Sequence, residues 1–176
     1  KDNNASFNIN FGTTDNRILK TKDLFFAPTL TTNGDIQIVS MKLKVSETQF
    51  LEYRYEMKPK EYMVNFSIRS QGLSNVINGS NPIHLDWSLD GYRHEKSLKT
   101  ENTMYSWYYY KSEGELESIR PGNTEIANNI DWVFYQQHSF SSALLTDTPF
   151  NNATITSTDL VKNEEIDTVF TKRYAL

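Results

Sequence analysis

The sequence predicts an all-β protein, in which antiparallel strands stack as the two sheets of a β-sandwich. Polar and apolar residues alternate one for one in several stretches, such as 51–57, 62–69 and 85–90. Successive side chains of a strand point to opposite faces of a sheet, so this period of two indicates strands with one buried face. A helical period is almost absent, and we expect short helical turns at most.

The composition fits one domain over residues 1–176 and excludes several classes of function. Ten Tyr, ten Phe and three Trp suit pleated, half-buried surfaces. The net charge is −4, with 18 basic residues spread among 22 acidic ones, which argues against a nucleic-acid partner. The chain has no cysteine, so a disulfide scaffold, a cysteine-type zinc site and a thiol nucleophile are all excluded.

The first half of the chain predicts two short strands and then a three-stranded meander. Apolar islands at 7–11 and 24–26 indicate the short strands, and Asn33-Gly34 predicts a tight turn because both residues tolerate positive φ. The apolar positions change parity between Ile38 and Met41, which predicts a bulge near 39–40. The meander is expected to comprise strands 36–46, 50–57 and 62–70.

The second half predicts further strands around one irregular excursion. The expected order is strand 84–89, an irregular segment 92–103 with at most one helical turn, strand 106–111, a short strand plus loop in 113–129, the strand pair 130–136 and 140–145, and two weaker strands at 153–161 and 169–174. The alternating strands need a partner for their apolar face, so the predicted core lies between paired sheets.

The polar residues predict no catalytic, cofactor-binding or metal-binding residue, and the protein is not expected to be an enzyme. His84, His94 and His138 are far apart in sequence, and none has the close-spaced partner of a metal or catalytic motif. The alternating acids at 113–117 are typical of the solvent face of a strand. No apolar run approaches the ~20 residues of a membrane helix, and no signal peptide is visible, so we expect a soluble chain or a soluble part of a membrane protein.

A row of aromatic residues at 107–110 is the most suggestive candidate for binding. Exposed aromatic rings on a β-sandwich stack on sugar rings or hold apolar peptides. One face of the strand must be core, so the exposed pair is either Trp107 and Tyr109 or Tyr108 and Tyr110.

Several stretches, in the same order, resemble the large periplasmic domain of the YidC-type membrane-protein insertases, especially the form found in Bacteroidetes. The strand–turn–strand 55–66 carries Lys58, Glu61 and Tyr62 at matching positions. The loop 72–77 and the excursion 95–109 are also similar. The best landmark runs from Trp132 through Gln137 to Phe140 and the small residues after it. Ser139 departs from the family, which usually has an aromatic residue there.

The resemblance implies a β-supersandwich of the galactose-mutarotase-like kind. It implies a non-catalytic periplasmic domain of an inner-membrane protein, truncated at both ends relative to the family. The parent would act as an insertase and chaperone in protein transport, with or without the Sec translocon. The implied partners are Sec components and nascent membrane proteins, and the membrane would be reached through transmembrane segments absent from this sequence. Open strand edges would favour a homodimer of the isolated domain.

Two other functions remain open from the residues alone. A carbohydrate-binding sandwich predicts coplanar exposed aromatic rings in the row 107–110. A mutarotase-like enzyme predicts that His84 or His138 lies within hydrogen-bond distance of a Glu or Asp. Fold kinship with sugar enzymes does not favour either, because function depends on sites.

Overall fold

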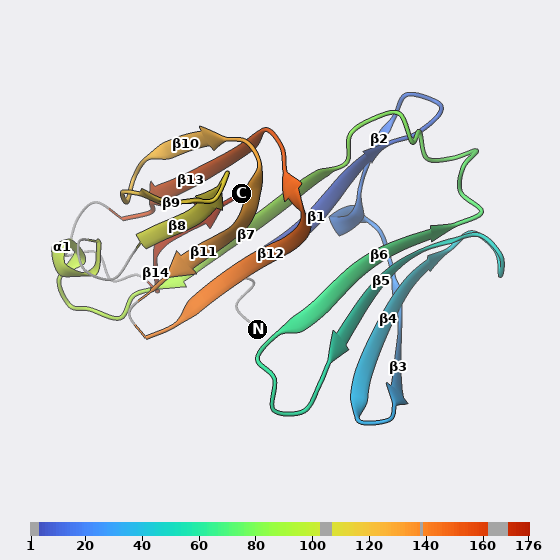
Figure 1. The fold of residues 1–176 in the computed structure, drawn as a ribbon, viewed down its shortest axis with the longest axis horizontal. Coiled ribbons are helices and arrows are strands. Elements are labelled where there is room, and N and C mark those ends of the chain that lie inside the picture. Colours follow the sequence, from blue (N-terminus) through green and yellow to red (C-terminus); the bar gives the residue numbers. More distant parts are fainter. Residues whose placement is uncertain (1–3, 103–106, 138, 162–168) are drawn as a thin grey trace. The chain divides into compact units, whose positions relative to one another are not determined.

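The computed structural model describes residues 4–102, 107–137, 139–161 and 169–176, and its chain divides into two compact units (Figure 1). The N-terminal unit is Asn8–His84, and the C-terminal unit is Leu85–Leu176 together with the residues up to Phe7. Strands make up 61% of the structure and helices 5%, and the sheets are antiparallel. The predicted all-β class is therefore confirmed, whereas the single domain over 1–176 stays a prediction.

The N-terminal unit is built around a four-stranded antiparallel sheet. Its strands follow one another in the order β3-β4-β5-β6. The elements are β1 (Ala5–Gly12, from Asn8 onward), β2 (Ile18–Lys20), the 3-10 turn η1 (Thr21–Asp23), β3 (Ala27–Asn33), β4 (Ile36–Lys44), β5 (Phe50–Met57) and β6 (Val64–Gln71). The predicted three-stranded meander is confirmed as β4-β5-β6, because neighbours in sequence pair through short turns. The short strand expected at 24–26 was wrong, since the strand there is β3, which begins at Ala27 and extends the meander to four strands.

Two local features of this sheet differ from the prediction. Asn33 pairs with Ile36, so the two-residue loop is Gly34-Asp35 rather than Asn33-Gly34. Gly34 has a φ of 63°, which a residue without Cβ adopts at little cost. The expected bulge near 39–40 was wrong, since β4 keeps a continuous register with β3 and β5. This interior strand simply carries apolar residues on both faces.

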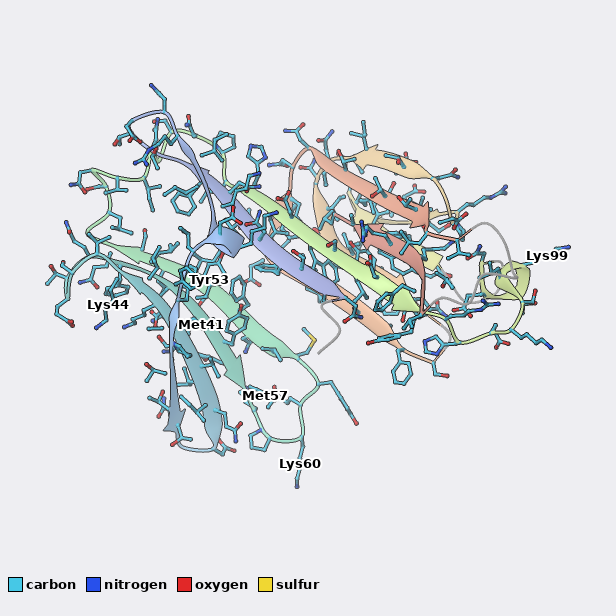
Figure 2. The ribbon with its side chains drawn as sticks, turned by 180° about the vertical axis from the view of Figure 1, so that it is seen from behind. Met41, Lys44, Tyr53, Met57, Lys60 and Lys99 are labelled. Carbon is cyan, nitrogen blue, oxygen red and sulfur yellow. The ribbon has the colours of Figure 1, made fainter. Side chains whose placement is uncertain are left out.

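The two faces of the sheet have opposite character. Met41 and Tyr53 are register partners on the apolar face, where both can be followed in Figure 2. The Tyr53 ring packs against Phe26 with centroids 5.0 Å apart. Its hydroxyl donates a hydrogen bond to Thr21 Oγ1 at 2.7 Å, and that oxygen also accepts the Ile9 backbone N–H at 2.9 Å. This buried threonine therefore ties η1 and β1 to the apolar face of the sheet.

The C-terminal unit contains two antiparallel sheets. One has the order β12-β11-β8-β9, and the other contains the series β10-β13-β14-β7 (Figure 1). The elements are β7 (His84–Tyr92), α1 (Leu98–Thr100), β8 (Trp107–Ser112), β9 (Glu115–Ile119), β10 (Thr124–Ala127), β11 (Ile130–Gln136), β12 (Ser141–Phe150), β13 (Ala153–Asp159) and β14 (Phe170–Ala175). The region 113–129, expected to hold one strand, holds two.

Tyrosines from both sheets form the core of the C-terminal unit. Tyr108 and Tyr135, cross-strand partners on β8 and β11, both contact Tyr174 of β14, with ring centroids 5.1 and 5.2 Å apart. Tyr108 is 1% exposed, and its hydroxyl lies 3.1 Å from the carbonyl oxygen of Ala175 and also within hydrogen-bond distance of that of Thr156. Those two residues pair in the opposite sheet, so this phenol joins the two layers.

Bulges occur in the C-terminal unit rather than in β4. The register of β11 shifts between Ile130 and Trp132 against both β8 and β12. The extra residue allows Ile130 and Val133 both to be fully buried, although their spacing is odd. In the described part of the chain, no helix combines the length and the apolar sequence needed to cross a bilayer.

Removing the Tyr108 hydroxyl should weaken the contact between the two sheets. We expect Tyr108→Phe to lower the free energy of unfolding by about 1 to 2 kcal/mol, because it removes a buried hydrogen-bond donor. Tyr62→Phe is the matched control, since that ring is fully exposed, and its effect should stay below about 0.5 kcal/mol. Urea unfolding of both variants measures this, and equal effects would contradict the interlayer role.

Candidate functional site

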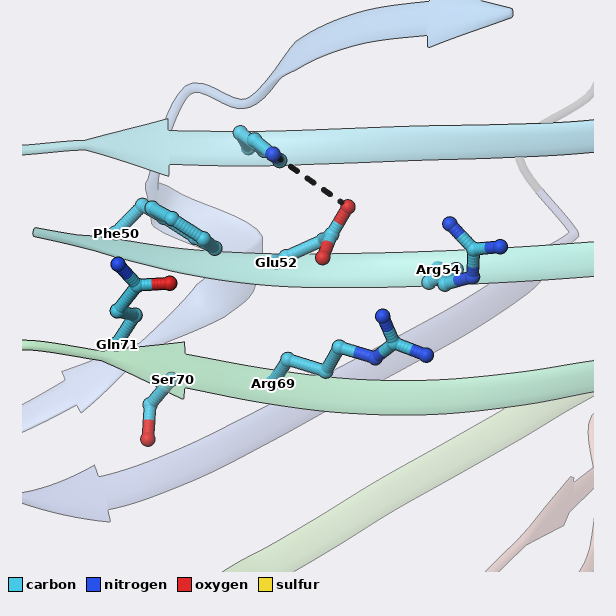
Figure 3. A pocket seen from close by; sticks show the side chains of 7 residues that line it. Phe50, Glu52, Arg54, Arg69, Ser70 and Gln71 are labelled. Carbon is cyan, nitrogen blue, oxygen red and sulfur yellow. Dashed lines mark ion pairs between the residues drawn. The ribbon is translucent and has the colours of Figure 1, made fainter. Parts of the chain in front are cut away.

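A polar hollow of about 440 Å³ lies on the face of the N-terminal sheet that is opposite to Tyr53 (Figure 3). It spans β4, β5 and β6, so it is built entirely within one unit. The residues that line it are Lys42, Phe50, Glu52, Arg54, Arg69, Ser70 and Gln71. Three cations and one carboxylate thus share a small area on a protein whose net charge is −4.

Strand register explains why these side chains meet. Glu52 of β5 pairs with Lys42 on one side and with Arg69 on the other. Phe50 lies two residues before Glu52 on the same face of β5, and it pairs with Gln71 of β6. Because residues i and i+2 of a strand share a face, the alternation that places Leu51 and Tyr53 on the apolar face places these residues in the hollow.

Glu52 is the buried centre of the hollow. The residue is 5% exposed, and its carboxylate accepts a hydrogen bond from the Ser40 hydroxyl. The Lys42 Nζ lies 3.9 Å from the same carboxylate, which is the ion pair drawn in Figure 3. That ammonium also lies 4.4 Å from the centroid of the Phe50 ring, a cation–π distance. Both of these partners of Glu52 lie on β4, and both engage the same oxygen, Oε1.

The two arginines of the hollow differ in their partners. Arg54 Nε donates to Glu56 Oε1 at 2.5 Å along the same strand. Arg69 is exposed, and no carboxylate in the described residues lies within ion-pair distance of it. Figure 3 shows its side chain running along β6 toward Arg54. One guanidinium, with five fixed donors, is thus left to bind an anion.

A second cluster of charges is buried in the C-terminal unit. Lys172 of β14 is 1% exposed, and its Nζ lies 2.6 Å from Asp159 Oδ1. Burial lowers the pKa of this ammonium, and the neighbouring Asp159 and then Glu101 offset part of the effect. The Glu101 carboxylate accepts the backbone N–H groups of His94 and Glu95 at 3.1 and 2.7 Å. These bonds order the excursion after β7, which is a structural role.

The residues that carry the family resemblance fall into two groups, one in each unit. Lys58 and Glu61 form an ion pair of 3.7 Å at the turn between β5 and β6, and Tyr62 beside them is fully exposed. Trp132 is half-buried on β11, and the Gln137 backbone N–H donates to the Phe140 carbonyl at 2.8 Å in the turn before β12. These positions shape turns and strands, and none of them lines the hollow.

One face of the aromatic row is core. Tyr108 and Tyr110 are buried between the sheets, so the alternative that exposed this pair is wrong. Burial raises the pKa of both phenols. Tyr109, on the other face, is half-buried and lies 6.2 Å from the Phe134 ring. The side chain of Trp107 lies outside the described residues.

The histidines give no support to a catalytic pair. His84 is exposed on β7, and His94 is exposed with its ring 5.9 Å from that of Phe140. His138 lies outside the described residues. Across the described ranges, no three His, Asp or Glu side chains gather in a metal-binding group.

Sequence reasoning did not find the hollow. Its charged residues come from three strands, at positions 42, 52, 54 and 69, and each looked like an ordinary solvent-facing residue. One signal was present: Phe50, Glu52 and Arg54 alternate with apolar residues, so their face could be deduced. Pairing each of them with its cross-strand neighbours would have required the registers.

Curated relatives match the chain over most of its length. It is 29% identical over 147 residues to the membrane protein insertase YidC of Phocaeicola vulgatus, covering 81% of this chain and 23% of the relative. It is 30% identical over 157 residues to YidC of Parabacteroides distasonis, covering 87% and 24%. For YidC of Porphyromonas gingivalis, the identity is 29% over 157 residues, covering 86% and 25%. The resemblance to the YidC insertases is thus confirmed.

The match covers most of this chain but only a small part of each relative. The chain spans about a quarter of the length of these curated relatives. No protein-family model and no solved structure matches the chain. The galactose-mutarotase-like supersandwich therefore rests on the sequence resemblance.

Neutralising Glu52 should destabilise the hollow. In Glu52→Gln, the ion pair with Lys42 and the charge-assisted bond from Ser40 are lost, so we expect the free energy of unfolding to fall by about 1 to 2 kcal/mol. The control is Glu47→Gln, which removes an exposed carboxylate paired with Lys44 and should cost less than about 0.5 kcal/mol. Urea unfolding measures both, and a larger loss in the control would contradict the assignment.

Lys172 should make stability depend on pH in the alkaline range. Its pKa is lower in the folded state than in the unfolded chain, so the unfolded state binds more protons between the two values and stability rises with pH there. The free energy of unfolding of the wild type minus that of Lys172→Met should therefore increase from about pH 7 to about pH 10. Groups that do not contact Lys172 contribute equally to both proteins, so the difference isolates the lysine.

Urea unfolding at both pH values measures this difference. Lys20→Met, which replaces an exposed lysine on β2, is the control, and its difference from the wild type should change less with pH. A wild-type minus Lys172→Met difference that stays constant or decreases would contradict the lowered pKa.

Proposed function

We propose that this chain, which is related in sequence to one segment of the YidC membrane protein insertases, is a non-catalytic extracytoplasmic domain of such an insertase. The observation that carries the proposal is the match to the relatives along up to 87% of the chain. In this proposal residues 1–176 form one periplasmic domain of an inner-membrane protein, and the parent inserts and folds other inner-membrane proteins.

The surfaces of the chain suit a contact role. Its exposed groups lie on turns and sheet faces, as with Tyr62 after β5 and Phe140 before β12. Exposed aromatic rings contribute large contact area with few rotatable bonds. The domain would act as a chaperone that meets nascent membrane proteins, alone or beside the Sec translocon. A homodimer of the isolated domain stays a prediction.

Single cysteines test the location, since the chain has none of its own. Ser118→Cys on β9 places a thiol at an exposed position, and Ser157→Cys on β13 places one at a buried position through the same substitution. In the full-length parent, with any other cysteine replaced by serine, a membrane-impermeant maleimide should label the first variant once the outer membrane is opened. Labelling that requires an opened inner membrane would contradict a periplasmic location.

The same thiols test the partner. A photo-crosslinker attached at position 118 should capture nascent inner-membrane proteins or translocon subunits during synthesis in intact cells. The buried position 157 should give no such adducts, because the reagent does not reach it. Capture of neither partner at 118 and at further exposed positions such as Tyr62 would count against the insertase role.

A further inference from the structure

The hollow on β4–β6 has an unpaired cation at its rim, and this combination points to a ligand. Glu52 Oε1 is engaged by Ser40 and Lys42, and Arg54 is engaged by Glu56. Arg69 has no ion-pair partner among the described residues, although it faces Glu52 across the strands. Glu52 balances Lys42 and Glu56 balances Arg54, so Arg69 leaves one uncompensated positive charge on this polar face.

We propose that this hollow binds a carboxylate side chain of an extended polypeptide segment, with Arg69 as its main ligand. The guanidinium fork matches the two oxygens of a carboxylate, and charge-assisted bidentate contacts are the strong ones. Lys42 adds a second cation to the site. The choice of a client polypeptide as the carrier of the carboxylate rests on the proposed function.

A second hollow favours an extended ligand over a free ion. It has about 330 Å³ and is lined by Leu73, Ile77 and small residues of the loop after β6, and Ser70 lines both hollows. The two hollows therefore share an edge within the N-terminal unit. A peptide that places an acidic side chain beside Arg69 can lay an apolar neighbour against Ile77.

Charge also favours a peptide over a membrane surface. The chain carries a net charge of −4, so an anionic lipid surface, with many charges, repels it as a whole. A segment with one or two carboxylates presents far less charge and is attracted over the short range that salt leaves unscreened. Segments that cross to the outside of the inner membrane are also poor in Lys and Arg, so their acids are left unpaired.

The probe is a short synthetic peptide with blocked ends, two Asp separated by one Leu, and flanking Ala and Gly. Its partner peptide carries Asn in place of Asp. Isothermal titration calorimetry with the 1–176 chain should give binding of the Asp peptide that is at least about tenfold tighter than that of the Asn peptide. Equal affinity for the two peptides, including no binding of either, would overturn the proposal.

Variants locate the site. Arg69→Gln should weaken binding of the Asp peptide by about tenfold or more, and Arg69→Lys should restore part of the loss because it keeps the charge. Arg120→Gln, which removes an exposed arginine of the other unit, should leave the affinity unchanged. Urea midpoints equal to that of the wild type show that the variants fold. A loss in Arg120→Gln as large as in Arg69→Gln would overturn the assignment to the hollow.

Two further arms separate the sources of the anion. Inorganic phosphate at the concentration of the peptide should not displace it, and vesicles of phosphatidylethanolamine and phosphatidylglycerol should not sediment the chain. Displacement by phosphate would reduce the site to one for simple anions and overturn the peptide assignment. Sedimentation that depends on Arg69 would assign it to lipid headgroups instead. The peptide, phosphate and vesicle measurements use the isolated chain, so they depend neither on its location in the cell nor on insertion activity. Their failure can therefore be distinguished from a failure of the cysteine-labelling experiment.

Discussion

The alternation of β5 is the constraint on which the N-terminal unit depends. Leu51 and Tyr53 lie on the apolar face, and Phe50, Glu52 and Arg54 lie on the polar one. A shift of one residue in the pairing would exchange the two faces and bury charges where the Tyr53 ring now packs. The bond from Tyr53 to Thr21 and the charged hollow therefore depend on the same register, although they lie on opposite sides of the sheet.

In the C-terminal unit the corresponding element is the group of tyrosines between the sheets. Tyr108, Tyr135 and Tyr174 combine large apolar area with hydroxyl groups that need partners when buried. Tyr108 meets this need by reaching the backbone of the opposite sheet, and burial raises its pKa so that the phenol stays neutral. One face of an aromatic-rich strand that looked suited to binding thus joins two layers.

The charge distribution of the hollow shows how a local site differs from the global composition. The net charge of −4 disfavours a polyanionic partner at long range, whereas Arg69 adds a local positive charge to the hollow beside the paired Lys42 and Glu52. Salt screens the long-range repulsion by the net charge more than the short-range attraction by Arg69, because short contacts lie inside the Debye length. A protein that is acidic overall can therefore still select a ligand with one or two carboxylates.

Much of the fold was accessible from local pattern, since a period of two is visible in any short window. The bounds of β5 and β11 were predicted without error, and the order of the meander followed from its turns. The choice between the two faces of β8 was not accessible, because residues 107–110 are aromatic at every position. The bulge at Ile130 to Trp132 also escaped, since it depends on pairing with β8 and β12.

The sequence by itself determined the all-β class, most strands and the kinship with the insertases, because these depend on neighbours in the chain and on ordered motifs. Only the tertiary structure decided that Tyr108 and Tyr110 face the core, and that Lys42, Glu52 and Arg69 share one hollow. The physical reason is that a strand specifies its two faces locally, whereas the residues beside it are set by the register of strands that lie far apart in sequence.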